Sequence, residues 1–161
     1  MRIMEYGITD SNMDERLFQN WLEERLELWP GEGRHDEHIE EMRQILTGKP
    51  VDGGTESGLL MCTSCDNLAG FLEYSIKDGI PGSAGTSIHI EGIHTRERYR
   101  RNGIAEALVK RLVEIAEKKG IKRLTSDIEA GNEASFLFHS AIGFIITVSD
   151  SEAVYLEKII G

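Results

Sequence analysis

The feature that most constrains the fold of this chain is a strand pattern that runs through a tight turn into an amphipathic helix. Residues 86–95, TSIHIEGIHT, have the composition and alternation of a strand. The helix pattern begins at Ile104, and Leu108, Leu112 and Ile115 continue it on one apolar stripe. A helix with such a stripe must be covered, and the strand directly before it indicates that a sheet does so.

Other strand and helix patterns alternate along the rest of the chain. Strands are expected at residues 1–9, 59–63, 68–76, 123–128, 144–149 and 153–160, and helices at 36–46 and 132–141. A further helix is expected after Asp10 or Ser11 as N-cap and ends at Pro30. Because 161 residues with 40% hydrophobic content suffice for one core, we expect a single domain over residues 1–161. The fold class is α/β or α+β, built on one mostly antiparallel sheet.

Charge is distributed unevenly over the sequence. Residues 96–123 hold ten of the 18 Lys and Arg but only four of the 28 Asp and Glu, which gives a local charge of +6. The formal net charge of -10 for the whole chain therefore leaves -16 on the other residues. One short segment is suited to an anion, while the rest of the surface attracts cations through long-range electrostatics.

The turn inside this basic segment has the composition of an anion-binding site. It reads RRNGIA, residues 100–105. Gly103 lets the backbone approach a ligand closely, and the small side chain of Ala105 leaves room beside it. The first N–H groups of a helix have no partner within the helix and lie at the positive end of its dipole, so they bind anions. The alternative is an ordinary solvated helix with Arg and Lys on its wet face.

The two cysteines and the N-terminal segment argue against other classes of protein. Cys62 and Cys65 form a single CxxC, and no other cysteine supplies the second ligand pair of a zinc site. We expect a strand end that runs into a turn, reduced thiols and no metal. The first twenty residues contain Asp10, Asp14 and Glu15 and no long apolar run, so neither a signal peptide nor a membrane span is expected. We therefore expect a cytoplasmic protein that does not bind membranes.

The basic turn also resembles a known family motif. Neither GxGxxG nor GxxxxGK[ST], the two common phosphate-binding motifs, fits the segment. Arg100, Gly103 and Ala105 match the pattern [Q/R]xxGx[G/A], the acetyl-coenzyme A (acetyl-CoA) turn of the GNAT superfamily of N-acetyltransferases. The stretch NEASFLFHSAIGF, residues 132–144, resembles a second marker of that superfamily. The resemblance covers residues 57–160 well and the first fifty residues more loosely.

Several further stretches resemble a narrower group, the aminoglycoside 6′-N-acetyltransferases of resistant bacteria. They are LELWPGEG, HIEEMRQIL, GFLEYSI, IEGIHT and TSDIEAGNEASFLFHSAIGF, and they follow one another in the order expected of that group. The resemblance implies a GNAT fold, in which a splayed central sheet is flanked by about four helices. It also implies a homodimer.

By the same resemblance, acetyl-CoA is the cosubstrate and its diphosphate lies on the turn. The strand at residues 86–95 would pair through free backbone groups with the pantetheine arm, and Gly92 suits a close approach. The residues implied in coenzyme binding are Ile93, Thr95, Arg100, Arg101, Asn102, Gly103, Ile104, Ala105, Asn132 and His139.

Two carboxylates are the candidates for acceptor binding and catalysis. Strand alternation predicts one shared face for four residues, His89, Glu91, Ile93 and Thr95. Glu91 falls where the similar enzymes carry an acceptor-site glutamate, and Asp127 where they hold an acid beside the acceptor amine. A protonated amine must lose a proton before it attacks a thioester, and either carboxylate can receive it. The alternatives are a glutamate at a wet strand edge and an aspartate that only caps a turn.

His139 and Trp29 complete the candidate site. Many GNAT enzymes carry a tyrosine at the position of His139, and its hydroxyl can protonate the departing thiolate. His139 could act as that acid, hydrogen-bond the coenzyme, or pack under the GF turn at residues 143–144. Trp29 could stack on a sugar ring of the acceptor, or belong to the core together with Trp21.

The expected function is the acetyl-CoA-dependent acetylation of a primary amine, the 6′-amine of an aminoglycoside, by direct attack. A backbone N–H at Ile93 or its neighbour would stabilise the oxyanion. The expected partner is a small cationic amine, in accord with the acidic remainder of the chain. Acetylation of another small polyamine or of a peptide amine, and a non-catalytic acyl-CoA sensor, are the alternatives. Nucleic acid is not expected as a partner, because Tyr99 is the only aromatic residue in the basic segment.

Overall fold

The computed structural model of the protein describes residues 1–7, 12–31, 35–50 and 53–161. Within these ranges seven strands form one sheet in the order β1-β2-β3-β4-β5-β7-β6. The strands are β1 (Arg2–Tyr6), β2 (Glu56–Ser64), β3 (Asn67–Asp78), β4 (Thr86–Thr95), β5 (Arg123–Glu129), β6 (Ile145–Ser149) and β7 (Ala153–Ile159), and the helices are α1 (Glu15–Leu28), α2 (His35–Leu46), α3 (Ile104–Lys119) and α4 (Glu133–Ala141), with a short 3-10 helix η1 (Glu97–Tyr99) before α3. Among the strand pairs of the described residues, only β4 and β5 are parallel. The expected fold class, with one mostly antiparallel sheet, is confirmed.

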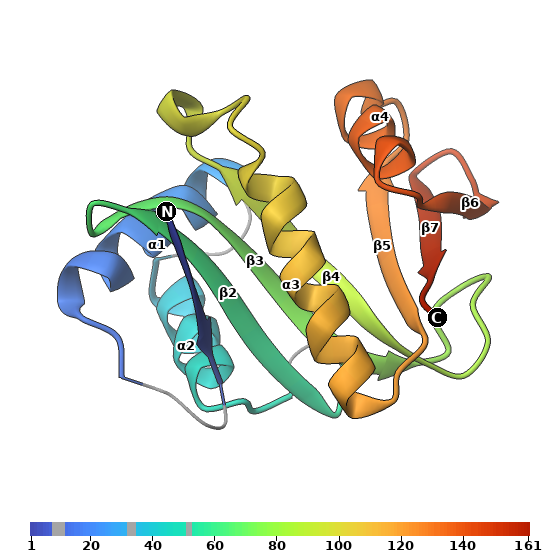
Figure 1. Ribbon diagram of the computed structural model, residues 1–161, viewed down its shortest axis with the longest axis horizontal. Coiled ribbons are helices and arrows are strands. Elements are labelled where there is room, and N and C mark those ends of the chain that lie inside the picture. The colour runs from blue at the N-terminus through green and yellow to red at the C-terminus, as the bar shows by residue number, and fades with distance from the viewer. Residues whose placement is uncertain (8–11, 32–34, 51–52) are drawn as a thin grey trace.

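Helices cover both faces of this sheet (Figure 1). α1 and α2 lie on one face, whereas α3 lies on the other and α4 stands over the C-terminal strands. Trp21 of α1 and Phe71 of β3 are fully buried in one apolar cluster, and Leu108 of α3 and Leu72 of β3 in a second. β3 therefore sends alternate residues into two separate layers. Among the described residues, no helix combines the length and the apolar character needed to cross a membrane.

The first helix begins later than expected. Asp14 is the N-cap of α1, and its Oδ1 accepts a hydrogen bond from the backbone N–H of Leu17 at 2.8 Å. The predicted caps, Asp10 and Ser11, lie outside the described residues. The predicted start was wrong because several residues that favour N-caps stand close together there, and only the packing of the helix selects among them.

The two cysteines lie where β2 turns into β3. Cys65 and Asp66 have positive φ angles, 50° and 64°, and connect Ser64 to its paired residue Asn67. Two consecutive residues with left-handed backbone form the type I′ turn, whose twist matches that of the strands. Cys62 is buried in β2, and both thiols are free. The interpretation of CxxC as a strand end that runs into a turn is confirmed.

A buried polar cluster fastens α1 to β3. The Glu73 carboxylate accepts a hydrogen bond from Trp21 Nε1 at 3.0 Å and forms an ion pair with Arg25. The Arg25 Nε also donates to His38 Nδ1 of α2 at 3.2 Å. On its other side the Arg25 guanidinium lies 4.9 Å from the ring centroid of Trp29. The cluster thereby holds the C-terminal end of α1, and the tryptophan that follows it, against the sheet.

Candidate active site

The sheet opens between its two central strands. The paired residues of β4 and β5 are Ile88–Leu124, His89–Thr125 and Ile90–Ser126. Beyond Ile90, β4 continues to Thr95 along β3, and beyond Ser126, β5 continues to Glu129 along β7. In the part of the chain that the structure describes, no strand lies between these two diverging segments. The sheet is therefore splayed, as the resemblance implied, and one edge of β4 is free to bind a ligand.

A β-bulge at Glu91 reverses the faces of β4 within this opening. Its neighbours Ile90 and Gly92 stand opposite consecutive residues of β3, which leaves Glu91 as the extra residue. Ile90 and Ile93 are an odd number of positions apart, yet both pack against the apolar cluster beneath α3. The bulge thus shifts the alternation of the strand by one residue.

The bulge makes one expectation wrong, the shared face of His89, Glu91, Ile93 and Thr95. Simple alternation assumes an unbroken strand. His89 and Glu91 face the layer of α1, whereas Ile93 and Thr95 face the layer of α3. One strand therefore presents an acidic group on one side of the opening, and a free backbone edge with an apolar surface on the other.

Asp127 is held at the opening by a chain of hydrogen bonds. Its Oδ1 lies 2.7 Å from Nε2 of the buried His89, and His89 Nδ1 lies 2.9 Å from Thr125 Oγ1. Thr125 Oγ1 lies in turn 3.0 Å from Ser87 Oγ. All of these groups are satisfied when each donates to the next in the order Ser87, Thr125, His89, Asp127. The chain orients an Asp127 side chain that is still 47% exposed.

These contacts favour the ionised form of Asp127. The hydrogen bond from His89 lowers the pKa of Asp127 below its ordinary value, and the positive charge of Lys77 acts in the same direction. Partial burial raises the pKa, but the hydrogen bond outweighs it. Asp127 is therefore a carboxylate at neutral pH, which can hold a cation and accept a proton from it.

Glu91 is already paired with a cation of the protein itself. Its Oε1 lies 2.5 Å from Lys77 Nζ of β3, and both side chains are largely buried. Lys77 also lowers the pKa of Asp127, so its ammonium group lies within electrostatic reach of both acids. An incoming ammonium group must compete with Lys77 for Glu91, whereas Asp127 faces solvent. Asp127 is thus the more accessible of the two acids.

His139 adjoins the opening from the opposite side of β5. Its Nε2 lies 2.9 Å from Oγ of Ser126, which is paired with Ile90 at the point of divergence. Its Nδ1 lies 2.7 Å from the backbone oxygen of Ser135. The ring therefore donates from Nδ1 and accepts the Ser126 hydroxyl at Nε2. His139 reaches the opening through Ser126 and does not project into it.

Burial keeps the His139 ring neutral. Desolvation lowers the pKa of His139 below its ordinary value, although the hydrogen bond to Ser135 opposes the shift. The ring centroid lies 5.1 Å from that of Phe144, whose backbone N–H donates to the His139 carbonyl at 2.9 Å. Of the three roles expected for His139, these contacts support packing under the GF turn.

The expected anion-binding turn lies at the start of α3. Gly103 is the N-cap with φ +70°, and a Cβ atom added there would meet no atom within 4 Å. Its carbonyl accepts the first helical hydrogen bond, from Ala107 N at 3.0 Å. The N–H groups of Ile104, Ala105 and Glu106 precede that bond, so they point outward at the positive end of the helix.

The residues just before the helix shape the same turn. Asn102 Nδ2 donates to the backbone oxygen of Tyr99 at 3.0 Å, and Arg100 Nε donates to that of Thr95 at 3.3 Å. Arg101 has left-handed backbone, with φ +67°, and is exposed. Left-handed residues in such a turn direct successive N–H groups toward one concave surface, which favours an anion.

Asn132 belongs to a different element from this turn. It is the N-cap of α4, and its Oδ1 accepts a hydrogen bond from Ser135 N at 3.2 Å. Together with Ile128 and Phe136 it lines a pocket of about 340 Å³. α4 stands apart from α3, above the end of β5 in the view of Figure 1. The structure therefore brings Asn132 to the β5 side of the opening and the basic turn to the β4 side.

Trp29 lies against the bulged part of β4. A Cβ atom at Gly92 would lie 2.7 Å from the Trp29 ring, so only glycine permits this contact. The close approach at Gly92 thus involves Trp29 on the face of the strand, and the expected pairing of the pantetheine arm with the backbone edge of β4 stays a prediction. Trp21, by contrast, is fully buried and belongs to the core. Trp29 is half-buried on the same side of the sheet as Glu91.

Sequence reasoning missed three residues that contact the candidate acids and His139. They are His89 as the partner of Asp127, Lys77 as the partner of Glu91, and Ser126 as the partner of His139. The available signal was the presence of polar residues inside otherwise apolar strands, such as Ser126 in RLTSDI. Such buried polar groups require partners, but the partners become evident only once the register of β4 and β5 is known.

Comparison with known proteins agrees with this geometry. The model of the acetyltransferase (GNAT) family matches residues 15–144. The chain belongs to the GNAT family. The matched region includes every candidate residue, from Trp29 directly after α1 to His139 on α4. The protein is accordingly an acetyl-CoA-dependent N-acetyltransferase, and the splayed sheet is the fold of this family.

Individual relatives extend over nearly the whole chain. It is 32% identical over 151 residues to an aminoglycoside N(6′)-acetyltransferase type 1 of Acinetobacter baumannii, covering 92% of this chain and 97% of that protein. A protein of the same name from Acinetobacter genomosp. 13 is 34% identical over 153 residues, with the same coverage. The crystal structure of aminoglycoside antibiotic 6′-N-acetyltransferase AAC(6′)-Ih from Acinetobacter baumannii superposes with a TM-score of 0.75 at 29% identity, covering 92% of this chain and 93% of that one.

Proposed function

We propose that this GNAT enzyme transfers the acetyl group of acetyl-CoA to the 6′-amine of an aminoglycoside antibiotic and thereby confers resistance. The observation that carries the proposal is the division of one opening into two surfaces of opposite character. Asp127 and Glu91 lie on the α1 side, and the outward N–H groups of the α3 turn lie on the other. A polycationic acceptor and a polyanionic coenzyme need such surfaces, and relatives along the whole chain are named for this acceptor.

The coenzyme lies along the α3 side of the opening in this proposal. The N–H groups from Gly103 to Ala105, with Arg100 and Arg101, suit its diphosphate, and the open space beside Gly103 leaves room for it. Each charge-assisted hydrogen bond contributes about 1.5–3 kcal/mol. The free β4 edge at Ile93 and Thr95 suits the amide groups of the pantetheine arm. On the far wall, Asn132 caps α4 with its oxygen, which leaves its amide nitrogen to donate to the coenzyme.

The acceptor lies on the α1 side in this proposal. Asp127 binds the reacting ammonium group, Glu91 adds negative charge beside it, and the Trp29 ring offers a flat surface for a sugar. The charge of -16 outside residues 96–123 attracts a polycation from a distance, an effect that salt screens. The chemistry of the acceptor is thus matched by short contacts at the opening and by the field of the whole surface.

Asp127 provides the proton acceptor for the reaction. An alkylammonium group, with a reference pKa of about 10.4, is mostly protonated at neutral pH, so its lone pair must be freed before it can attack. Asp127 accepts that proton, directly or through water, and passes it to solvent. Acetyl-CoA supplies the activated acetyl thioester. The new C–N bond forms as the C–S bond breaks, the sulfur leaves with the electron pair and takes up a proton, and the nitrogen releases its second proton.

Two further groups of the chain assist this step. Successive N–H groups along a strand point to opposite edges, so either Gly92 or Ile93 directs its N–H to the free edge of β4, where it donates to the acyl oxygen. A neutral His139 accepts a hydrogen bond at Nε2, so it has no proton to give there. We therefore assign His139 to the positioning of Ser126 and α4, and assign the proton taken up by the sulfur to solvent.

The proposed function is tested by thiol release from acetyl-CoA in the presence of kanamycin or tobramycin. Spermidine and a peptide with a free N-terminus serve as control acceptors. We expect kcat/KM to be at least about 100-fold higher for the aminoglycosides, because their rings engage Trp29 and several acids at once. NMR of the product should place the acetyl group on the 6′ nitrogen. Turnover of spermidine or peptide at a comparable rate would contradict the acceptor, and coenzyme binding without turnover would support a sensor.

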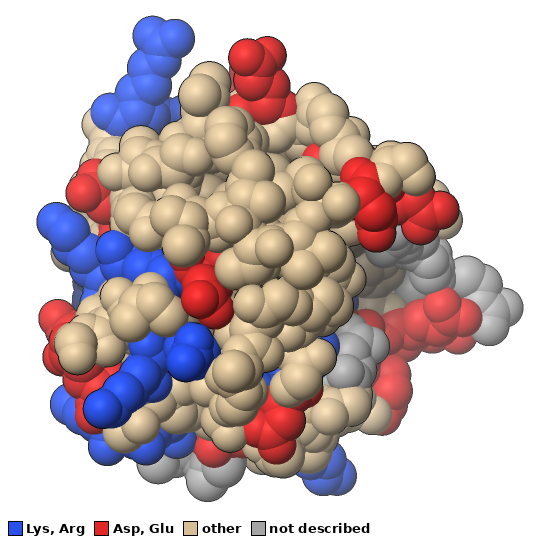
Figure 2. Space-filling view, turned by 90° about the vertical axis from the view of Figure 1, so that its right-hand side faces the viewer, with Lys and Arg blue, Asp and Glu red and all other residues tan. Residues whose placement is uncertain are grey.

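We propose that the protein acts as a homodimer in the cytoplasm. β6 is an edge strand of the sheet, and Ile145, Ile146 and Val148 on it are exposed. The face that carries α4, β6 and β7 has a broad area without charged side chains (Figure 2), which suits a second copy of the chain. Light scattering coupled to size exclusion measures the mass of the particle in solution, and a monomer at micromolar concentration would contradict the dimer.

The cysteines support the proposed location in the cytoplasm. Free thiols such as those of Cys62 and Cys65 are usual in a reducing compartment.

The role of His89 can be tested through the pH profile. In His89→Leu, Asp127 loses the hydrogen bond that lowers its pKa while its burial remains, so the pKa of Asp127 rises. We expect kcat to fall about 10- to 100-fold, and the acidic limb of kcat/KM to move to higher pH. His89→Gln, whose amide can still donate, should restore much of both. A loss of kcat without movement of the acidic limb would mean that His89 only supports the fold.

A further inference from the structure

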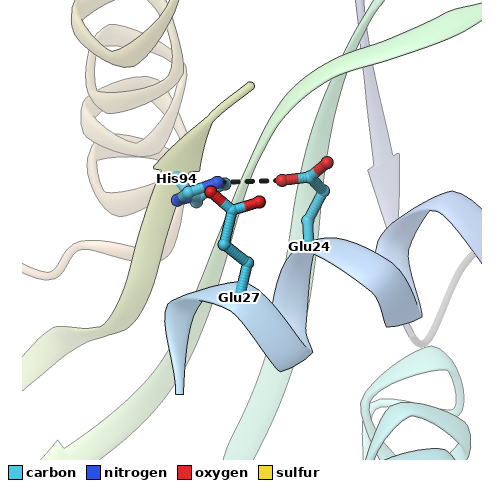
Figure 3. Close-up of side chains that lie close together, drawn as sticks. All are labelled: Glu24, Glu27 and His94. Carbon is cyan, nitrogen blue, oxygen red and sulfur yellow. Dashed lines mark ion pairs between the residues drawn. The ribbon is translucent and has the colours of Figure 1, made fainter. Parts of the chain in front are cut away.

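A cluster that the acetyl-transfer scheme does not use joins α1 to β4. The carboxylates of Glu24 and Glu27 on α1 converge with the imidazole of His94 on β4 (Figure 3). One ligand atom from each residue lies within 4.8 Å of the other two. The two glutamates point the same way because residues three apart share a helix face. His94 points toward α1 because it follows the bulge at Glu91.

Two buried atoms of this cluster face each other without a hydrogen bond. Glu24 Oε2 and His94 Nε2 form an ion pair at 2.9 Å (Figure 3), but their orientation does not make a hydrogen bond, and among the described residues neither atom has one elsewhere. The Glu24 side chain is only 8% exposed. An ion pair compensates the burial of its two groups fully only when hydrogen bonds accompany it. A metal ion between the two atoms would bind both of them.

We propose that Glu24, Glu27 and His94 bind one divalent transition-metal ion of the Zn²⁺ class, with water completing its coordination. An imidazole nitrogen together with carboxylate oxygens is a ligand set that Zn²⁺ accepts, whereas Mg²⁺ and Ca²⁺ prefer oxygen alone. With metal–ligand bonds of about 2.0–2.2 Å, neighbouring ligand atoms of a tetrahedral site stand about 3.3–3.6 Å apart. Glu24 Oε2 and His94 Nε2, at 2.9 Å, need to separate by only a few tenths of an ångström to admit the ion.

Arg96 supports the arrangement from outside. Its Nε lies 2.7 Å from Glu24 Oε1, the oxygen that faces away from His94 Nε2. An outer partner of this kind fixes the orientation of a ligating carboxylate. The carboxylates of Glu24 and Glu27 and the guanidinium of Arg96 together leave a net charge of about -1, so a divalent cation is still attracted. A pocket of about 500 Å³, lined by Glu24, Glu27 and Arg96 among others, connects the cluster to solvent.

The inferred ion goes beyond the proposed function and does not depend on it. It would tie the last turn of α1 to β4 at the place where Trp29 packs on Gly92. An ion that binds only the folded protein stabilises it by mass action. At a free concentration about 100-fold above its Kd, one ion should raise Tm by about 5–10 °C for a domain of this size.

The test uses untagged protein, stripped of metal, and Zn²⁺ as the probe. We expect isothermal titration calorimetry to show one equivalent bound, with a matching rise in Tm that Ca²⁺ at the same concentration does not produce. His94→Gln should weaken Zn²⁺ binding by at least about 100-fold, since loss of a ligand exceeds the 10- to 100-fold cost of an outer partner. Glu27→Gln, at an exposed position, should weaken it at least about 10-fold without harm to the fold.

The matched control replaces one histidine and one glutamate that lie outside the cluster. His35→Gln combined with Glu40→Gln on α2 changes exposed side chains and should leave Zn²⁺ binding unchanged. Equal affinity in wild type, His94→Gln and Glu27→Gln would overturn the proposal, as would the absence of a stoichiometric site in wild type. A third result, in which both variants keep Zn²⁺ affinity but raise the KM for an aminoglycoside, would assign the cluster to a substrate ammonium group instead. Failure of acetyl transfer alone leaves the Zn²⁺ result unaffected.

Discussion

Gly103→Glu is expected to weaken coenzyme A binding by at least about 100-fold. The glutamate side chain would enter the open space beside the N-cap of α3, where no protein atom lies within 4 Å, and would set a negative charge against the diphosphate. It would also displace ligand from the outward N–H groups, and the loss of two charge-assisted hydrogen bonds accounts for about 3 kcal/mol or more. Isothermal titration calorimetry with coenzyme A measures the change.

Gly120→Glu is the matched control for this substitution. Gly120 caps the other end of the same helix, has the same φ of +70° and also has open space around it. A glutamate there carries a similar backbone strain of about 1–2 kcal/mol, so it reports what strain alone does to Tm and to binding. Retained binding in Gly120→Glu with lost binding in Gly103→Glu would support the turn. Normal affinity in Gly103→Glu would place the coenzyme elsewhere.

Asp127→Asn should lower kcat by about 10²- to 10⁴-fold, the usual range for loss of a general base. The amide has nearly the same shape as the carboxylate and can still contact His89, but it carries no charge and accepts no proton. Because Asp127 faces the α1 side of the opening, the Kd of coenzyme A should change little. Single-turnover acetylation of kanamycin and calorimetry with coenzyme A separate the two effects.

Glu114→Gln is the control for the loss of one negative charge. Glu114 is an exposed carboxylate on α3 that pairs with Arg111 and lies outside the opening. Its replacement should leave both kcat and coenzyme affinity within about twofold of wild type, as surface changes usually do. If Asp127→Asn lost coenzyme affinity and kcat to the same extent, Asp127 would be a residue of the fold or of the coenzyme site instead of a proton acceptor.

Most elements of the fold were predictable because their signals are local. The strand at residues 86–95 and the helix over 132–141 match β4 and α4 with its cap at Asn132. The apolar stripe of Ile104 and Leu108 is buried beneath α3, as the period of the pattern requires. The start of α1 was missed because the choice of N-cap depends on how the helix packs and not only on its sequence.

The candidate site was predictable only in part. Gly103 and Asp127 occupy the ends of elements, where turn composition and strand length give strong signals. The bulge at Glu91 gave no such signal, and without it the faces of Ile93 and Thr95 were assigned incorrectly. The contact between His89 and Asp127 spans 38 positions and depends on the parallel register of β4 and β5, which local patterns do not encode.

The splayed sheet has a consequence for the exchange of amide hydrogens with solvent. Along β4 from Glu91 to Thr95, N–H groups that face the gap have no neighbouring strand within the described chain to protect them. Such amides exchange rapidly in the free protein, while those bonded to β3 exchange slowly. A cosubstrate that lies along this edge closes the gap as an additional strand would, so it should slow alternate amides of β4 and leave the intervening ones unchanged.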